Sequence, residues 1–83
     1  MRKKDQQRES FLLKSFGEVV RIRRVKLNMT QEELGNVAKL HRTYITDIES
    51  GLRNLTFLTM ERIAAALDTS LAELIGEAES IDS

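Results

Sequence analysis

The sequence predicts an all-α protein of five helices, and three observations support this fold class. The chain of 83 residues has no proline, and no segment alternates clearly between apolar and polar residues, so a β-sheet is not expected. Apolar residues instead recur every three or four positions, which is the period of an amphipathic helix. Thr30, Thr56 and Ser70 each precede such a segment, where a hydroxyl can cap the first turn of a helix. A chain of this length is expected to fold as one domain with a modest core.

The composition argues against several classes of function. The chain has no cysteine, which excludes disulfides, thiolate metal sites and cysteine nucleophiles, and its single histidine cannot build a histidine-rich metal site. Glu32 and Glu33 are neighbours on a predicted helix and point in different directions, so they form no acid–base pair. We therefore expect that the chain is not an enzyme and that it binds no metal, cofactor or small-molecule ligand. No apolar run is long enough to cross a membrane and no signal peptide is visible, so a soluble cytoplasmic protein is expected.

The first predicted helix covers about residues 10 to 27. Its buried stripe is expected to consist of apolar residues near helical spacing, namely Leu13, Phe16, Val20 and Leu27, with Leu12 and Val19 on the flank. Asn28 tolerates a left-handed conformation and can end this helix. Residues 1 to 9 are polar and are expected to form a flexible tail.

The second predicted helix, residues 31 to 38, has the clearest start. Thr30 and Glu33 match a capping box, in which each side chain accepts a hydrogen bond from the other residue's backbone N–H. The third predicted helix, residues 42 to 49, follows a short corner. His41 is expected to be its polar cap, and Gly51 can take the left-handed conformation that ends it.

Two further helices are predicted in the last third of the chain. Thr56 can cap the fourth, whose apolar face is expected to contain Phe57, Met60, Ile63, Ala64 and Leu67. Ser70 and Glu73 match a second capping box, which opens a short fifth helix that ends near Gly76. Residues 77 to 83 are then expected to form a C-terminal tail.

The second and third predicted helices have the layout of a helix-turn-helix DNA reader. A helix that enters the major groove needs one face that packs on its own protein and another that presents hydrogen-bonding groups to base edges. Ile45 and Ile48 supply the first face. The second face carries the expected base contacts, which are Arg42, Thr43, Tyr44 and Thr46. A plainer alternative stays open for each of them, since Arg42 can bind phosphate and the other three can simply be solvated.

The net charge is zero, but the charges are unevenly distributed. Residues 1 to 26 contain nine Lys and Arg against three Asp and Glu, a balance of +6. Residues 27 to 55 have a balance of −1, and residues 56 to 83 contain one basic residue against six acidic ones, a balance of −5. A basic first part can face DNA phosphates, while an acidic last third can face solvent or a protein partner.

From about Phe16 to Leu74 the chain resembles the DNA-binding domains of the lambda repressor and Cro class, also called the XRE family. The recurrent residues of that class appear here as Phe16–Gly17, Arg24, Thr30–Leu34, Ile45, Ile48–Glu49, Gly51, Arg53–Asn54, Leu67 and Ser70–Leu71. More narrowly, the chain is similar to the controller proteins of restriction–modification systems, on the basis of Arg42–Ile45, Ile48–Glu49 and Arg53–Thr56. Two positions depart from the class pattern, since Lys39 stands where glycine is common and Gly35 where alanine is usual.

The resemblance implies roles for further residues. DNA phosphates would be contacted by Gln31, Ser50, Arg53 and Asn54. Arg24 and Glu49 would form a structural ion pair; the alternative is that Arg24 reaches solvent and Glu49 is free. Acidic residues on the second helix touch RNA polymerase in lambda-type activators, which suggests that Glu32 and Glu33 contact its sigma subunit. Helix capping and dipole compensation alone also explain these two glutamates.

The expected function is that of a transcription regulator, a controller that binds a pseudo-palindromic DNA operator as a homodimer and both activates and represses transcription. The expected dimer interface consists of Leu71, Leu74 and Ile75, because these exceed what a short terminal helix needs for its own packing. Residues 10 to 76 would then form the DNA-binding and dimerisation domain. The alternative is an antitoxin or a phage-type repressor whose acidic C-terminal third binds another protein.

Overall fold

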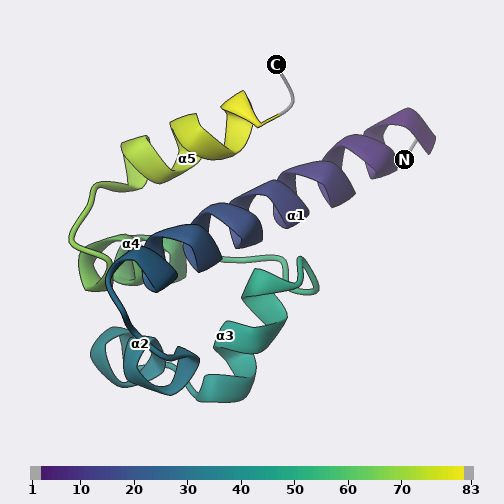
Figure 1. Cartoon of the computed structure of the whole chain (residues 1–83). Coiled ribbons are helices and arrows are strands. Elements are labelled where there is room, and N and C mark those ends of the chain that lie inside the picture. The colour runs from purple at the N-terminus through teal and green to yellow at the C-terminus, as the bar shows by residue number, and fades with distance from the viewer. Residues whose placement is uncertain (1–2, 82–83) are drawn as a thin grey trace.

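The structure, a computed structural model, describes residues 3 to 81 and contains five helices within them (Figure 1). These are α1 (Lys3–Lys26), α2 (Gln31–Ala38), α3 (Arg42–Glu49), α4 (Phe57–Ala66) and α5 (Leu71–Ser80). The described residues contain no strand, so the predicted all-α fold class is confirmed. The bounds of α2 and α3 are those that the sequence predicts.

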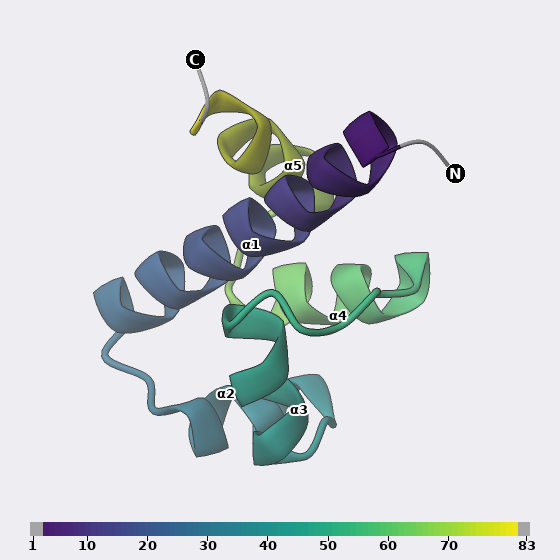
Figure 2. The ribbon, with the colours of Figure 1, turned by 90° about the vertical axis from the view of Figure 1, so that its right-hand side faces the viewer.

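α1 runs through the middle of the molecule (Figure 2). α5 packs along one side of α1 and α3 packs on its other side, while α2 packs against both α3 and α4. The largest fully buried side chains come from all five helices and are Val20, Leu34, Ile45, Ile48, Ile63 and Leu74. This shared core fixes α3 on α1 and α2 through its apolar face.

Three predicted helix starts are confirmed. The Glu33 backbone N–H donates to the Thr30 hydroxyl oxygen at 3.0 Å, and the Thr30 N–H donates to the Glu33 carboxylate at 2.8 Å. Thr56 caps α4 by accepting a hydrogen bond from the Thr59 N–H at 3.1 Å. Ser70 accepts from the Glu73 N–H at 3.1 Å, but Glu73 does not return the bond, because its carboxylate accepts from the Thr69 hydroxyl at 2.7 Å. The second capping box is therefore only half formed.

The corner between α2 and α3 is tight. Lys39 adopts the left-handed conformation with φ of 61°, which costs a non-glycine residue about 1 kcal/mol. Gly35 explains how the chain turns so closely, because a Cβ at this position would lie 2.5 Å from the Leu40 carbonyl oxygen. Gly17 is equally constrained on α1, where a Cβ would lie 2.2 Å from the Ile48 carbonyl oxygen. α1 therefore crosses the end of α3 at a distance that only glycine permits.

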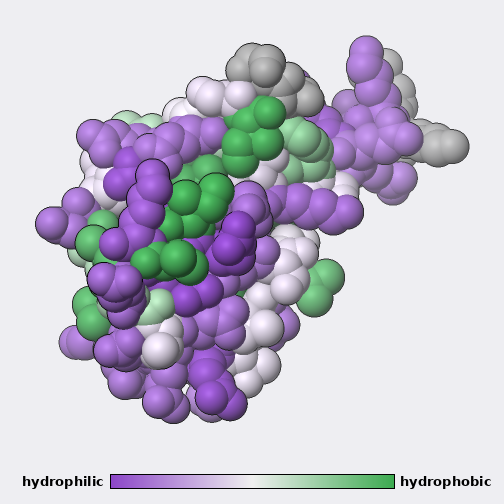
Figure 3. Space-filling view, viewed as in Figure 1, coloured by the Kyte–Doolittle hydropathy of each residue, from purple (hydrophilic) through white to green (hydrophobic). Residues whose placement is uncertain are grey.

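Both ends of the helical domain extend beyond the predicted bounds. The chain expected as a flexible tail over residues 1 to 9 is helical from Lys3 onward, and residues 1 and 2 lie outside the described part. Lys, Gln, Arg and Glu all favour helices, and the acidic Asp5 lies in the first turn. This end of α1 protrudes from the bundle and has a hydrophilic surface (Figure 3), so no apolar stripe could have predicted it.

The predicted C-terminal boundary is also corrected. α5 continues past Gly76 to Ser80, and Ala78 lies in the core with 3% of its surface exposed. Of the tail expected over residues 77 to 83, residues 82 and 83 lie outside the described part. Gly76 does not end α5, because the helix is held beyond it by the packing of Ala78.

Two expected core residues are exposed. Phe57 is 68% exposed because it is the first residue of α4, and a helical side chain points back toward the N-terminal end of its helix. Leu27 is 47% exposed because α1 ends at Lys26, so Leu27 no longer follows the helical spacing.

Candidate DNA interface

α3 has one buried and one exposed face, as predicted. Ile45 and Ile48 are 0% and 2% exposed, whereas Arg42, Thr43 and Thr46 are exposed. The helix begins at His41, whose Nδ1 accepts a hydrogen bond from the Thr43 N–H at 3.0 Å. This confirms His41 as the polar cap of α3.

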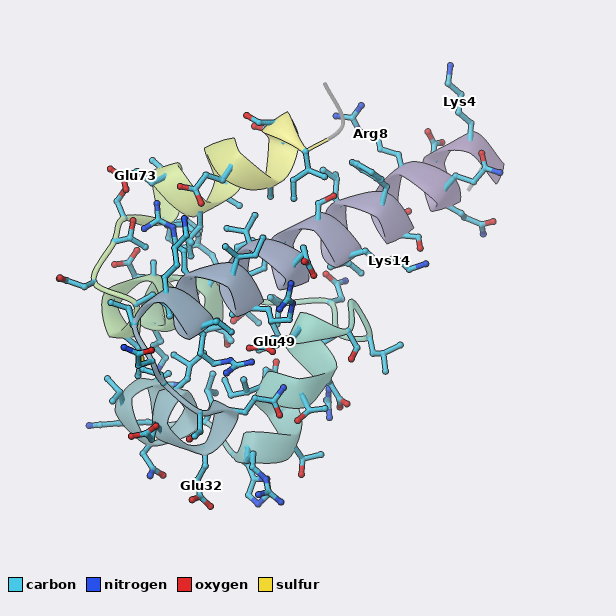
Figure 4. All side chains as sticks on the ribbon, in the orientation of Figure 1. Lys4, Arg8, Lys14, Glu32, Glu49 and Glu73 are labelled. Carbon is cyan, nitrogen blue, oxygen red and sulfur yellow. The ribbon has the colours of Figure 1, made fainter. Side chains whose placement is uncertain are left out.

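The ion pair implied for Arg24 and Glu49 is present. Arg24 Nε and Nη2 donate to the two carboxylate oxygens of Glu49 at 2.6 and 3.0 Å. Their side chains are only 13% and 5% exposed, and Glu49 lies between α1 and α3 (Figure 4). Arg24 Nη1 also donates to the Met29 carbonyl oxygen at 2.8 Å. One guanidinium therefore connects α1, the segment before α2 and the end of α3.

Gln31 extends this connection to the exposed face of α3. Its amide nitrogen donates to Glu49 Oε1 at 3.0 Å, and its amide oxygen accepts from the Thr46 hydroxyl at 2.8 Å. The expected phosphate contact Gln31 and the expected base contact Thr46 are thus bonded to each other. Sequence reasoning missed this link, because the three side chains come from two helices whose relative rotation no spacing reveals.

Arg53 and Tyr44 also contact each other. The guanidinium carbon of Arg53 lies 4.7 Å from the centroid of the Tyr44 ring, and Arg53 Nε donates to Asp47 Oδ2 at 3.1 Å. The half-buried Tyr44 ring thus attracts the Arg53 guanidinium through a cation–π contact, whether or not Tyr44 also contacts DNA. Asp47 was not singled out from the sequence.

Three more polar residues lie around the end of α3. Ser50 and Asn54 are exposed, as is Lys14 of α1. Lys14 lies beside the loop that follows α3 (Figure 4), and its Cγ would be 2.7 Å from a Cβ at Gly51. Lys14 is a basic group near the expected phosphate contacts that sequence reasoning missed, since it belongs to a distant segment of the chain.

The two glutamates proposed to touch polymerase differ in their surroundings. Glu33 forms the capping box with Thr30, whereas the exposed Glu32 side chain points away from α2 into solvent (Figure 4). Only Glu32 is therefore free to serve a partner without a structural cost.

The expected dimer residues are not equivalent. Leu74 is 0% exposed, because α5 packs on α1 through the face that carries Leu74 and Ala78. Leu74 therefore belongs to the core of its own chain, which corrects its assignment to a dimer interface. Leu71 and Ile75 are half-buried and keep part of their surface exposed.

The opposite charges of α1 and α5 meet in ion pairs. Arg23 pairs with Glu77 through Nη2 and with Glu73 at 3.4 Å. The hydrogen bond from Arg23 lowers the pKa of the Glu77 carboxyl below its ordinary value, against a smaller opposing effect of burial. Two acidic residues of the C-terminal third, Glu73 and Glu77, are thus neutralised by a basic residue of α1.

The residues that the structure describes include no cluster of three potential metal ligands. None of their helices is both long and apolar enough to span a membrane.

Comparison with known proteins gives one consistent result. A family model described as "Helix-turn-helix" matches residues 20–74. The control protein C.BamHI of Bacillus amyloliquefaciens is 48% identical over 61 residues, which cover 72% of this chain and 75% of that protein. The control protein C.MunI of a Mycoplasma species is 36% identical over 59 residues, covering 71% and 80% of the two chains.

Solved structures agree with these relatives. The restriction–modification controller protein C.AhdI from Aeromonas hydrophila has a TM-score of 0.73 at 34% identity and covers 75% of this chain and 94% of that one. The wild-type controller protein C.Esp1396I has a TM-score of 0.74 at 36% identity, with coverage of 83% and 92%. The chain therefore belongs to the helix-turn-helix family and, within it, to the restriction–modification controller proteins.

Proposed function

We propose that this chain regulates transcription by binding a pseudo-palindromic operator as a homodimer, and that it both activates and represses. The supporting observation is the outer face of α3. Arg42 and Thr43 stand exposed in its first turn, and Thr46 follows one turn later. Because the opposite face of α3 is anchored in the core, the helix can enter a major groove as a rigid unit.

Arg42 is the residue proposed to read a guanine. An arginine fork matches the O6 and N7 acceptors of guanine, and the Arg42 side chain is exposed in the first turn of α3, where it can reach a base edge. Thr43 and Tyr44 are proposed to make further base contacts beside it.

The phosphate contacts are proposed on both sides of α3. On one side, Ser50, Arg53 and Asn54 follow the helix, and the exposed Lys14 adds a positive charge next to Gly51. On the other side, Gln31 lies at the N-terminal end of α2, where the helix dipole favours an anion. Its amide nitrogen has a second hydrogen, which remains available for a phosphate oxygen.

The homodimer surface is proposed at the start of α4. Phe57 and Leu58 are 68% and 72% exposed there. One turn later, Met60 lines an apolar groove between α1, α4 and α5, which also includes Leu55 and Ile75. A two-fold axis at this surface would bury these apolar side chains and present two copies of α3 to successive major grooves.

One alternative has a specific observation behind it. An immunity repressor protein of Bacillus phage phi105 is 33% identical over 63 residues, but these cover only 44% of that protein. A phage-type repressor shares the DNA-binding face and need not activate transcription. The antitoxin alternative is less supported, because Arg23 already pairs with Glu73 and Glu77 of the acidic α5.

Selection of bound duplexes from a random DNA pool tests the proposal. We expect two half-sites in inverted repeat, with centres about 10 base pairs or a multiple of that apart. A single unrepeated half-site would contradict the dimer, and no enriched sequence would contradict the regulator itself.

A further inference from the structure

The direction of one hydrogen bond determines what α3 can read. Among the four proposed base contacts, all of which the structure describes, only Thr46 uses its side chain in a hydrogen bond within the domain. Its hydroxyl oxygen lies 2.8 Å from the Gln31 amide oxygen and 3.2 Å from the Arg42 carbonyl oxygen. Both neighbours are oxygen atoms that only accept hydrogen bonds.

The orientation of the Gln31 amide follows from the ion pair behind it. The Glu49 carboxylate, bound by Arg24 through two contacts of 2.6 and 3.0 Å, acts as an acceptor. The amide group that lies 3.0 Å from Glu49 Oε1 must therefore be the nitrogen, since a second acceptor there would be repelled. The amide oxygen then faces Thr46.

The Thr46 hydroxyl must consequently donate its single proton toward the protein. Whether Gln31 or Arg42 receives the proton, none remains for a ligand on the outer side. The exposed side of Thr46 offers only oxygen lone pairs and a methyl group. An unconstrained threonine hydroxyl, in contrast, can rotate either to donate or to accept.

We propose that Thr46 recognises a base amino group, the N6 of adenine or the N4 of cytosine, and that Gln31 is the positioning residue that imposes this preference. The inference rests on the proposed function, in which α3 lies in the major groove. Adenine N6 and cytosine N4 are the hydrogen-bond donors of the major-groove edge, whereas guanine O6 and thymine O4 are acceptors. An acceptor placed opposite Thr46 would find no proton.

Base analogues in the selected operator test this proposal one functional group at a time. Purine replaces adenine and removes N6, pyrimidin-2-one replaces cytosine and removes N4, and uracil replaces thymine and removes the methyl group. At the operator position that Thr46 contacts, removal of the amino group should raise the Kd of the wild-type protein about 3- to 10-fold, which is the range of a single hydrogen bond. The purine and pyrimidin-2-one duplexes show whether the base is adenine or cytosine.

Thr46→Val keeps the shape and the methyl group and removes the hydroxyl. For this variant the same amino removal should change the Kd less than 2-fold. Thr43→Val is the matched control, because Thr43 is exposed on the same helix and its hydroxyl, unlike that of Thr46, is not bonded to Gln31. With Thr43→Val, the amino group opposite Thr46 should keep its full effect.

Gln31→Leu tests the positioning role. It removes the nearer of the two acceptors and leaves only the Arg42 carbonyl oxygen, at 3.2 Å, to hold the Thr46 proton. Because the hydroxyl is then less constrained, the effect of amino removal should fall to about half or less of its original fold-change. The measured quantity is the ratio of Kd values with and without the amino group, and a general loss of stability weakens binding to both duplexes alike. Thermal unfolding followed by circular dichroism shows that each variant is folded. An unchanged response to amino removal in Gln31→Leu would show that Gln31 does not position Thr46.

The outcomes separate this inference from the proposed function. If the protein selects no sequence, both fail. If the protein selects an operator but Thr46→Val reduces the Kd effect of removing no amino group, only the inference fails. If Thr46→Val abolishes only the Kd effect of removing a thymine methyl group, Thr46 makes an apolar contact, and the inference is also overturned.

Discussion

Arg24 of α1 and Glu49 of α3 form a two-contact ion pair that is largely buried, with side chains 13% and 5% exposed. The pair also carries the hydrogen bond from Gln31, which continues to Thr46 on the exposed face of α3. The orientation of the proposed reading helix is therefore tied to α1 by charge as well as by apolar packing.

Arg24→Ala is expected to lower the free energy of unfolding by about 3–5 kcal/mol, because it leaves the Glu49 carboxylate buried without its partner. Arg21→Ala is the control, since Arg21 pairs with Glu18 at the surface, where both side chains are 46% exposed. Urea denaturation of the two variants should show a large loss only for Arg24→Ala. Similar, small losses in both would mean that the buried pair contributes little.

Phe57→Asp is expected to convert a dimer into a folded monomer, because it places a charge in the proposed apolar interface without touching the core. Val37→Asp is the control, since Val37 is 59% exposed on α2, away from the start of α4. Sedimentation equilibrium measures both. Leu74→Ala should instead destabilise each protomer by about 2–5 kcal/mol, because Leu74 is fully buried. A wild-type protein that stays monomeric at high micromolar concentration would refute the proposed dimer.

Glu32→Ala is expected to reduce transcription activation while leaving operator affinity unchanged, because Glu32 is exposed and points away from α2. Glu33→Ala is a poorer probe, since it also removes the capping box and with it about 1 kcal/mol of helix stability. A reporter assay in parallel with a gel shift measures the two effects. Unchanged activation in Glu32→Ala would leave helix dipole compensation as the only role of this residue.

The Glu77 carboxyl makes the stability of the protein depend on acid pH. Its pKa is lowered in the folded state by the hydrogen bond from Arg23, so its contribution is present above the ordinary pKa of 4.5 and is lost as pH falls through the lowered value. Glu77→Gln should therefore reduce the loss of stability on acidification, and by less than about 1 kcal/mol, because the side chain is 46% exposed and screened by solvent. Denaturation at several pH values between 7 and 3 measures this. Glu79→Gln removes an exposed carboxylate of α5 that does not pair with Arg23, and an equal effect of that change would contradict the assignment.

The helix starts and the two-helix reader could be predicted because their determinants are local. A capping box needs only Thr30 and Glu33 three positions apart, and the buried Ile45 and Ile48 are spaced by one turn. The left-handed Asn28 and Gly51 are similarly local, since each residue type tolerates that conformation by itself.

Features that depend on how helices meet could not be predicted from local patterns, and the Arg24–Glu49 pair was expected only from the family resemblance. The inward direction of Leu74 follows from the side of α5 that packs on α1, which periodicity alone does not fix. The contacts of Gln31 with Glu49 and Thr46 require the relative rotation of α2 and α3. The helical extension before Ser10 was missed because its prediction rested on an apolar stripe, whereas helix propensity alone sustains a polar protruding segment.

Arg42 is proposed to read bases, whereas Arg53 is proposed to hold the DNA backbone. A salt titration of Arg42→Ala and Arg53→Ala against the selected operator and a scrambled duplex distinguishes these two roles. Arg42→Ala should weaken operator binding by about 1–3 kcal/mol and leave scrambled DNA almost unaffected. Arg53→Ala should weaken both duplexes similarly and reduce the slope of log K against log salt by about one. Equal loss of affinity for both duplexes in Arg42→Ala would show that Arg42 contacts phosphate and does not read a base.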